Sequence, residues 1–356
     1  MLRQIFTAAA FVAYAAAAPL DTASQFAELK AQHGRDYATP ALEQAAFEAM
    51  QLNLQEIERL SAENPNAEFG LNKFFDMSKE QFAATHLTYK SSDAYENLSE
   101  VELPEEYAPQ EAKDWTGVAT TPVKDQGQCG SCWAFSATEQ IESIWMQSKG
   151  CTMGKGKGCV LAPQQITSCD KVDKGCQGGD TLTAYKYVEK AGGLESAYSM
   201  PYKSGKSGKN GACKFEKSKV VANIAEGMKV SAKKEAGMRQ YVDQTSPLSI
   251  CIDASSWQNY KSGILQKCGK QLDHCVQIAG FDTASGAVPA WKVRNSWNTD
   301  WGEKGFIRLE MGKDMCGITT EPTTVKMAKS VEGELNETME EVPVFFEGTE
   351  MMGGVQ

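Results

Sequence analysis

The stretch GQCGSCWAF, residues 127–135, places two cysteines three positions apart, directly before a tryptophan and an apolar run. The apolar spacing from Phe135 to Trp145 predicts a buried helix that begins at or next to Cys132. A catalytic thiol has to ionise near neutral pH, and the amides at a helix N-terminus lower its pKa. Cys132 is therefore the candidate nucleophile, whereas Cys129, one turn earlier, is better placed to staple the loop.

Two other chemistries use a pair of cysteines at this spacing. A thioredoxin-type redox dithiol requires the pair before a helix in a βαβ unit. A zinc site requires a second pair of ligands, for which Cys169 and Cys176 are the candidates. Neither context is clean in this chain, so both alternatives rank behind the nucleophile hypothesis.

A thiol nucleophile needs a base, and the chain has only 3 histidines. His33 and His86 lie in an acidic N-terminal arm, so a base in the main body has to be His274. On its own, a histidine in a strand-like run is usually structural. Asn295, in RNSWNTDWG, is the candidate for orienting the imidazole, with Trp297 shielding that hydrogen bond from water.

The N-terminus and the cysteine count indicate export. Residues 1–18 combine Arg3, an apolar run and small residues, which is typical of a signal peptide and too short for a membrane span. No later segment is apolar enough to span a membrane, so no stable membrane insertion is expected. In an oxidising compartment, 11 cysteines predict five disulfides and one free thiol.

Charge is spread unevenly along the chain. Residues 19–102 carry 6 Lys and Arg against 15 Asp and Glu, residues 103–327 carry 28 against 24, and residues 328–356 carry 1 against 7. A mildly basic body therefore lies between two acidic arms, and the second arm is expected to be a disordered tail. No basic patch with interleaved aromatics occurs, so nucleic acid is not expected as a partner. We expect a monomer without cofactor or metal.

The chain divides into an arm, a linker and a two-part body. Helical spacing of apolar residues predicts one short and one long helix over residues 24–60. The polar segment 90–102, which contains a glycosylation sequon at Asn97, predicts a domain boundary, and a second sequon lies at Asn336. In the body a helical half comes first, and from about residue 219 short β-rich runs alternate with turns.

Three sequence blocks together resemble the papain family of cysteine proteases, close to its cathepsin L-like group. QGQCGSCWAFS resembles the family's nucleophile block, DHCVQIAG its histidine block and RNSWNTDWGEKGF its asparagine block, in the family's order. The resemblance covers roughly residues 24–327. It implies Cys132 as nucleophile, His274 as general base and acid, and Asn295 as the orienting residue. It also implies that Gln126 and the backbone N–H of Cys132 form the oxyanion hole.

The resemblance further implies the fold and the domains of a preproenzyme. The expected fold class is α+β: a papain-like two-domain fold with a helical left domain, a β-barrel right domain and a cleft between them, preceded by a helical inhibitory prodomain. The expected domains are a signal peptide at 1–18, the prodomain at 19–102, the peptidase domain at 103–327 and an acidic C-terminal tail at 328–356.

The prodomain resembles its family with departures. The pattern G-x-N-x-F-x-D is present from Gly70 to Asp76, and Asn53 and Ile57 fit the motif of the long helix. Three other positions of that helix depart from the motif, which has an aromatic residue, an arginine and a glutamate there. They are Met50, Ala46 and Leu42, respectively.

The resemblance also implies disulfide pairs. The family's three bridges correspond to Cys129 with Cys176, Cys169 with Cys213, and Cys268 with Cys316. A fourth bridge, between Cys151 and Cys159, would close the insertion TMGKGKG. Cys251 and Cys275 occupy strand positions that line the S2 pocket in the resembling enzymes. The sequence leaves open whether these two are bridged or are buried free thiols.

Family positions define the expected substrate cleft. Asp180 and Thr181 replace a common aromatic–proline pair, so the S2 wall should be more open and more polar. Glu321 corresponds to the base of S2 in several relatives, with Leu182 expected beside it; the alternative is a surface glutamate. The expected substrate-binding residues are Gly130, Gly178, Gly179, Asp180, Cys251, Cys275, Trp297 and Glu321.

These features predict a cysteine endopeptidase that is secreted or kept in a lysosome or vacuole. Its partners are protein and peptide substrates and its own prodomain, which acts as an intramolecular inhibitor. Acid should activate the zymogen by cleavage near residues 98–104, because protonation weakens the attraction between the carboxylates of the prodomain and the basic body. The P2 preference should be apolar, with arginine accepted by ionised Glu321 and favoured increasingly between pH 4 and pH 7.

Two rival functions remain open at this point. One is an exopeptidase, although the form with a dihistidine occluding loop is excluded because the body has no second histidine. The other is a non-catalytic binding or storage relative, which usually lacks the nucleophile.

Overall fold

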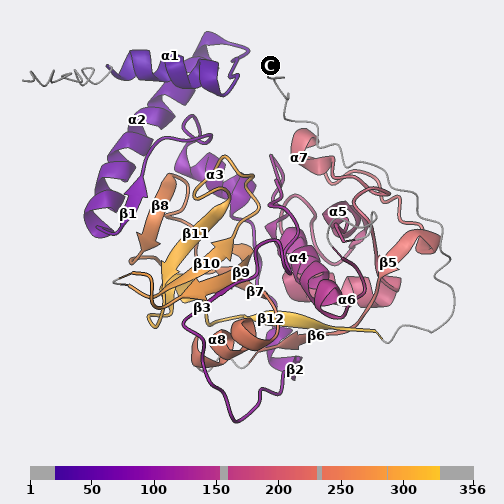
Figure 1. Ribbon diagram of the computed structural model, residues 1–356. Coiled ribbons are helices and arrows are strands. Elements are labelled where there is room, and N and C mark those ends of the chain that lie inside the picture. The colour runs from indigo at the N-terminus through magenta and orange to yellow at the C-terminus, as the bar shows by residue number, and fades with distance from the viewer. Residues whose placement is uncertain (1–20, 153–158, 231–234, 287, 329–356) are drawn as a thin grey trace, which may run out of the picture.

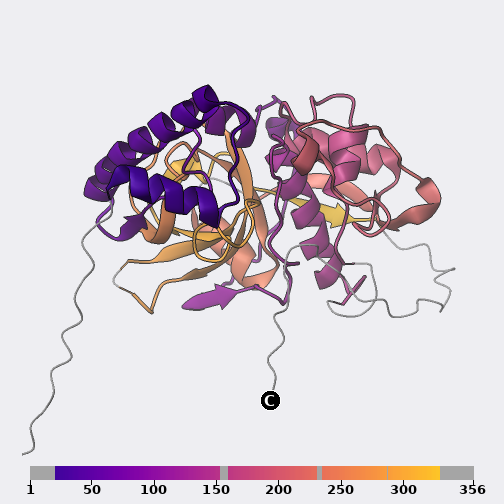
Figure 2. The same cartoon turned by 90° about the horizontal axis from the view of Figure 1, so that it is seen from above.

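The computed structural model describes residues 21–152, 159–230, 235–286 and 288–328. The expected signal peptide at 1–18 and the acidic tail from residue 329 onward lie outside this part of the chain. A helical half and a sheet half lie side by side, and the N-terminal helices cover one side of the sheet half (Figure 1, Figure 2). This two-part α+β architecture with a helical arm confirms the expected fold class.

The helical half surrounds one central helix. This helix, α4 (Cys132–Gln147), contacts α5 (Pro163–Cys169) and α6 (Thr181–Ala191), and its residues 132–143 are all buried. Apolar side chains such as Trp133 join α4 to the core of this half. Because a helix that is covered on all sides cannot turn a polar face to water, its polar residues need partners inside the protein.

Those partners form a buried cluster of charges. Glu142 Oε2 lies 2.6 Å from Lys124 Nζ, and Glu139 Oε2 lies 3.5 Å from Arg294 Nη2. Arg294 is the last residue of a strand in the sheet half and is completely buried. Buried charges of this kind are tolerated only when they are paired and hydrogen-bonded. The cluster therefore fixes the central helix against the strand that carries Arg294.

The sheet half consists of strands that pair into one large, mostly antiparallel sheet. Its strands are β1 (Ala67–Phe69), β2 (Ser99–Glu100), β3 (Ala112–Asp114), β6 (Ile224–Lys229), β7 (Leu248–Ile252), β8 (Tyr260–Leu265), β9 (His274–Asp282), β10 (Ala290–Arg294), β11 (Phe306–Glu310) and β12 (Thr323–Met327). Their order is β1-β8-β11-β10-β9-β7-β12-β6-β2, with β3 paired to β9. The core of this half is rich in tryptophan and includes Trp257, Trp291, Trp297 and Trp301.

The N-terminal arm docks on the sheet half through both side chains and backbone. It contains α1 (Thr22–Gln32), α2 (Pro40–Glu63) and α3 (Lys79–His86), and its strand β1 pairs with β8 of the body. Thr39 caps α2 and Pro40 occupies its first turn, which is the usual start signal of a helix. Met50, at a position where the family motif has an aromatic residue, is completely buried in the small core of the arm.

The segment expected to be a polar linker follows the surface of the body. It contains η1 (Tyr95–Asn97) and then β2, which pairs in parallel with β6. The Val101 N–H donates to the Lys229 carbonyl at 2.9 Å, and Leu98 packs against the core of the helical half. The linker is therefore held along an edge of the sheet.

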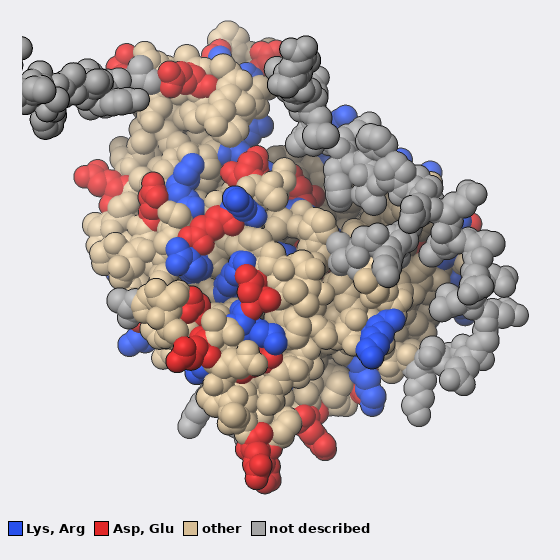
Figure 3. Space-filling view, in the orientation of Figure 1, with Lys and Arg blue, Asp and Glu red and all other residues tan. Residues whose placement is uncertain are grey.

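The remaining elements complete the two halves. They are β4 (Leu194–Glu195), α7 (Ser204–Ser207), η2 (Lys217–Lys219), β5 (Val220–Ala222), α8 (Glu235–Gln244) and η3 (Met315–Gly317). On the face shown in Figure 3, Lys and Arg side chains lie beside Asp and Glu. One ion pair of the body joins Lys270 Nζ to Asp314 Oδ2 at 2.7 Å. No helix in the described ranges has the length and apolar character required to cross a membrane.

Candidate active site

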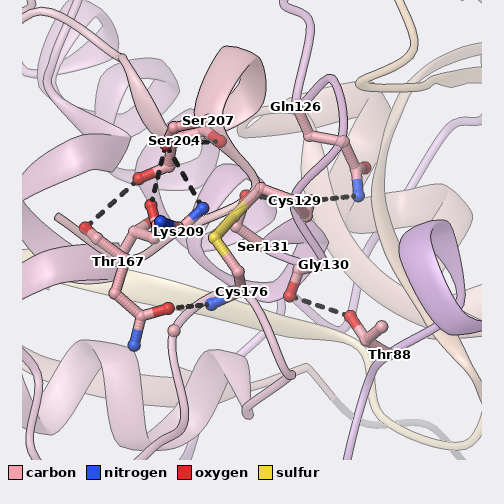
Figure 4. The surroundings of a disulfide bond; sticks show 12 residues. Thr88, Gln126, Cys129, Gly130, Ser131, Thr167, Cys176, Ser204, Ser207 and Lys209 are labelled. Carbon is pink, nitrogen blue, oxygen red and sulfur yellow. Dashed lines mark hydrogen bonds between the residues drawn. A yellow bond between two sulfur atoms is a disulfide. The ribbon is translucent and has the colours of Figure 1, made fainter. Parts of the chain in front are cut away.

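Cys132 is the first residue of α4, as the sequence predicted for its candidate nucleophile. The preceding loop is tied to the loop before α6 by the Cys129–Cys176 disulfide (Figure 4). Cys132 is completely buried and is the one cysteine of the chain that has no disulfide partner. Burial raises the pKa of the Cys132 thiol, although hydrogen bonds from the Cys275 and Thr88 segments oppose the rise. With residues 88–90 in place the Cys132 thiol is therefore harder to ionise than a free cysteine, which is the opposite of the lowered pKa expected for a helix N-terminus.

His274 and Asn295 form a buried pair in the sheet half. His274 begins β9, and its Nε2 lies 2.8 Å from Asn295 Oδ1. The Trp297 ring covers the imidazole at a centroid distance of 4.8 Å and excludes water from the pair. Burial lowers the pKa of His274 to about 4, and the hydrogen bond with Asn295 acts in the opposite direction. The imidazole is thus held neutral, with one nitrogen fixed by Asn295.

Gln126 is held beside the nucleophile loop by three hydrogen bonds. Its Oε1 accepts from Ser296 Oγ at 2.8 Å and from Trp297 Nε1 at 3.2 Å. Its Nε2 donates to the Cys129 carbonyl at 3.1 Å (Figure 4). The amide is completely buried. Its orientation is therefore fixed by both halves of the molecule.

A segment of the N-terminal arm covers this group of residues. Thr88 Oγ1 donates to the Gly130 carbonyl at 2.8 Å (Figure 4). The Tyr89 N–H donates to the Asp273 carbonyl at 2.9 Å, and the Lys90 N–H to the Gly179 carbonyl at 3.0 Å. Because Asp273 belongs to the sheet half and Gly179 to the helical half, residues 88–90 lie between the two halves.

The glycines next to this segment allow it to approach closely. Gly178 has a φ of +110°, and a Cβ built there would lie 2.1 Å from the Thr88 carbonyl oxygen. A Cβ on Gly130 would lie 2.5 Å from the Cys176 carbonyl oxygen and from Thr88 Cγ2. Any side chain at either position would push the segment out of the cleft.

Tyr89 fills a pocket beside Cys132. Its ring packs with Cys132, Cys251 and Cys275, and its hydroxyl donates to the Glu321 carboxylate. Glu321 also accepts from Ser91 Oγ at 2.8 Å. The pocket thus has one buried acid within reach of its occupant.

Of two residues expected to line the pocket, one borders it and the other lies in the core. Asp180 borders the same segment, because its carboxylate accepts from the backbone N–H and the hydroxyl of Ser92. Leu182, expected beside Glu321, belongs instead to the core of the helical half. The reason is helical geometry, since the first turn of α6 directs Leu182 toward α4 and the sheet.

The cysteines form five disulfides. They are Cys129–Cys176, Cys151–Cys159, Cys169–Cys213, Cys251–Cys275 and Cys268–Cys316. The pair that the sequence left open, Cys251 and Cys275, sits at directly opposed positions of β7 and β9. This bridge therefore forms part of the wall against which Tyr89 packs.

Comparisons with known proteins agree with this arrangement. Residues 108–326 match the family described as papain family cysteine protease, and residues 26–82 match the cathepsin propeptide inhibitor domain. The chain belongs to the papain family of cysteine proteases. It is made with an inhibitory propeptide, and the covered cleft is that of a zymogen.

Named relatives of this papain-family zymogen are similar over most of the chain. Cysteine proteinase B of Leishmania mexicana is 38% identical over 321 residues, which cover 86% of this chain and 70% of that protein. Cysteine proteinase 1 of Dictyostelium discoideum is 35% identical over 325 residues, covering 85% and 92%. Among solved structures, digestive procathepsin L 3 of Tenebrio molitor superposes with a TM-score of 0.75 at 26% identity, covering 86% of this chain and 99% of that one.

One residue of the zymogen cleft was not identified from the sequence. His86, placed only in the acidic arm, is 2% exposed and stacks on Phe82 at a ring distance of 4.9 Å. It also meets the edge of Trp297 at 5.8 Å. Burial lowers the pKa of His86 to about 3, and His274 adds to the shift. No local pattern marks this role, because the contact joins segments far apart in the chain.

Proposed function

We propose that the mature chain is a cysteine endopeptidase in which Cys132, His274 and Asn295 act together. The observation that carries this proposal is the 2.8 Å bond between His274 and Asn295 under Trp297, together with a free cysteine at a helix N-terminus that contacts Cys275, the residue after His274. Once the arm leaves the cleft, His274 takes the proton of the Cys132 thiol, the resulting thiolate attacks a peptide carbonyl, and the imidazolium protonates the leaving amine. Water, deprotonated by His274, then releases the acyl group and restores the thiolate.

Gln126 and the Cys132 backbone N–H are proposed to stabilise the tetrahedral oxyanion. The three hydrogen bonds that orient the Gln126 amide support this role. An oxyanion-hole donor typically contributes about 3 kcal/mol to transition-state stabilisation. Gln126→Ala should therefore lower kcat by roughly 10²-fold or more with little change in KM.

Labelling with a thiol-reactive epoxide tests the enzyme hypothesis directly. After maturation, stoichiometric labelling of Cys132 together with peptide hydrolysis is the expected result. Absence of both would mean that the chain is a non-catalytic binding relative. Cys132→Ala is the matched control, because it should abolish labelling and hydrolysis while the zymogen keeps its fold.

We propose that acid activates the zymogen, with a first cut near residues 98–104. The sequence predicts ion pairs between carboxylates of the prodomain and basic side chains of the body. One such pair joins Glu63 of the prodomain to Lys267 of the body at 3.3 Å. Lys73 makes the reverse pair with Asp300 at 2.9 Å. His86 adds a second acid-sensitive contact, because protonating a buried imidazole next to His274 is unfavourable. Faster maturation at pH 4.5 than at pH 7 is the expected outcome.

The proposed P2 preference combines apolar side chains with arginine. The contact of Tyr89 with both the disulfide wall and Glu321 supports a pocket that is apolar on its sides and acidic at its base. A carboxylate accepts charge-assisted hydrogen bonds from a guanidinium group, so Glu321 can hold a P2 arginine at the base of this pocket. Glu321→Ala should reduce P2-Arg hydrolysis and spare P2-Leu.

We further propose that the protein acts within the secretory pathway, either outside the cell or in a lysosome or vacuole. The five disulfides and the sequon at Asn97 support this location. The ratio of secreted to cell-associated enzyme, together with the glycan on Asn97, would test it.

A further inference from the structure

Two carboxylates face one extended segment of the prodomain, residues 89–92, in the pocket beside Cys132. Glu321, 7% exposed, accepts from Tyr89 and Ser91, and Asp180, 1% exposed, accepts from Ser92. Because Ser91 and Ser92 are consecutive, the two carboxyl groups lie against neighbouring positions. Burial raises the pKa of Asp180, and the negative charge of Glu321 adds to the rise, which agrees with their proximity.

Hydrogen-bond donors to the pocket-facing oxygens come from the prodomain. Within the described part of the chain, Glu321 accepts only from Tyr89 and Ser91, and Asp180 Oδ2 only from Ser92. The other oxygen of Asp180 accepts from the Leu182 N–H at 2.9 Å and caps α6. One oxygen of Asp180, Oδ1, therefore caps α6, and the other, Oδ2, faces the pocket.

Removal of the prodomain therefore leaves both carboxylates without these donors. Water can then hydrate both carboxylates, but a substrate side chain that displaces this water has to replace its hydrogen bonds, because a carboxylate in a confined site is unfavourable unless it is paired or hydrogen-bonded. The neighbouring surface, formed by the Cys251–Cys275 bridge and Leu272, is apolar and suits the methylene groups of a long side chain. A guanidinium group carries five N–H donors in a planar fork and one positive charge, so it can bind two carboxylates at once.

We propose that Asp180 is a second specificity-determining residue, which together with Glu321 forms a dicarboxylate S2 pocket for the guanidinium group of a P2 arginine. This inference rests on the proposed endopeptidase function and extends it. Under the proposal, Asp180 and Glu321 share the recognition of the cation, so the pocket keeps part of its preference for arginine when either acid is neutralised.

The test uses the mature enzyme and four fluorogenic peptides that differ only at P2. The P2 residues are arginine, lysine, leucine and citrulline, the last being an uncharged analogue of arginine with nearly the same shape. The quantity measured is the ratio of kcat/KM for P2-Arg to that for P2-citrulline at about pH 6. This ratio isolates the contribution of charge from that of size.

The variants are chosen so that the fold is kept. Asp180→Asn and Asp180→Ser retain a residue type that caps helices well but remove the charge. Glu321→Gln removes the charge of the second acid and keeps the size of its side chain. Asp173→Asn is the matched control, because Asp173 accepts from the Asp180 backbone N–H at 3.2 Å and its described bonds do not reach the prodomain segment.

Each single neutralisation of Asp180 or Glu321 should lower the Arg-to-citrulline ratio roughly tenfold, and the double variant should bring the ratio close to one. Asp173→Asn should leave the ratio unchanged.

Three results would overturn the inference. The first is an unchanged ratio in the Asp180 variants, and the second is an equal loss in Asp173→Asn. The third is an Arg-to-citrulline ratio of one in the single variant Glu321→Gln, because Asp180 would then contribute nothing. This result can be obtained even when neither Asp180 variant matures. In each case P2-Leu hydrolysis by wild type shows that the proposed endopeptidase function stands. Absence of that hydrolysis would instead refute the function itself.

Discussion

The N-terminal arm holds the body at two adjacent places that use different chemistry. At the first, which we call the aromatic anchor, Phe74, Phe82 and His86 pack on Trp297. The second place is residues 89–92, which we call the hydroxyl segment. There Tyr89, Ser91 and Ser92 donate to the carboxylates of Glu321 and Asp180. The two are joined by Leu87 and Thr88 alone.

The difference separates the affinity of the arm for the body from the register of the arm in the cleft. Burial of aromatic rings contributes a large free energy that hardly depends on pH, except through His86. Hydrogen bonds to carboxylates contribute less, because water satisfies the same groups once the segment leaves. We therefore expect the aromatic anchor to contribute most of the affinity of the arm for the body. The hydroxyl segment should set the position of residues 88–92 along the cleft.

Phe82→Ala should have the largest effect on the closed zymogen. The Phe82 ring lies 5.1 Å from both the Phe74 and the Trp297 rings, so its loss leaves a cavity between prodomain and body. Truncation of a buried phenylalanine typically costs about 3–5 kcal/mol. The rate of epoxide labelling of Cys132 in intact zymogen at pH 7 should rise by more than 10²-fold. Leu42→Ala, at a side chain that is 54% exposed, is the control and should change nothing.

His86→Phe should flatten the pH dependence of activation. Since burial lowers the pKa of His86 to about 3 while a released histidine titrates near 6.5, the closed state binds fewer protons than the open one. The contribution of His86 to closure is therefore complete above pH 6.5 and is lost progressively as pH falls toward 3. The titratable groups facing it are His274 and Lys73, and a positive charge on either one disfavours protonation of His86.

At pH 4.5 the loss amounts to about 2–3 kcal/mol. Phenylalanine keeps the ring contacts and does not titrate, so the maturation rate of the variant at pH 4.5 should fall by about 10²-fold relative to wild type. An unchanged rate profile between pH 4.5 and pH 7 would mean that groups other than His86 control activation.

Tyr89→Phe should weaken closure by less than the loss of an anchor ring. The variant keeps the ring in the pocket and removes only the hydroxyl that donates to Glu321. A hydrogen bond to a charged group typically contributes about 1.5–3 kcal/mol. The labelling rate of Cys132 in the zymogen at pH 7 should increase roughly tenfold. In a Glu321→Gln background the same substitution should have a smaller effect, which a double-mutant cycle would measure.

Ser92→Ala should have the smallest effect of the series. The backbone N–H of Ser92 still donates to Asp180 Oδ2 at 3.1 Å after the hydroxyl is removed. The expected loss is about 1 kcal/mol, or a several-fold faster labelling of Cys132. An effect larger than that of Phe82→Ala would reverse the assignment of strength to the anchor.

The sequence was informative where chemistry is encoded locally. The blocks around Cys132, His274 and Asn295 resemble those of the papain family in their order, and this resemblance predicted the fold. Contacts of residues 86–92 could not be predicted in the same way, because they depend on the path of the prodomain across a cleft formed by both halves. The position of Leu182 could not be predicted either. The orientation of the first turn of α6 decides whether this side chain lies in the core or in the pocket, and it lies in the core.

The pairing of β2 with β6 has a consequence for the kinetics of maturation. Residues 88–90 occupy the cleft over Cys132, while Ser99 and Glu100 are hydrogen-bonded along a sheet edge. A molecule whose cleft is filled by one segment cannot at the same time bind the segment 98–104 as a substrate. The first cut near these residues is therefore expected to come from a second, already active molecule. Maturation should be bimolecular and autocatalytic, with a lag that shortens as zymogen concentration rises and disappears when a trace of mature enzyme is added.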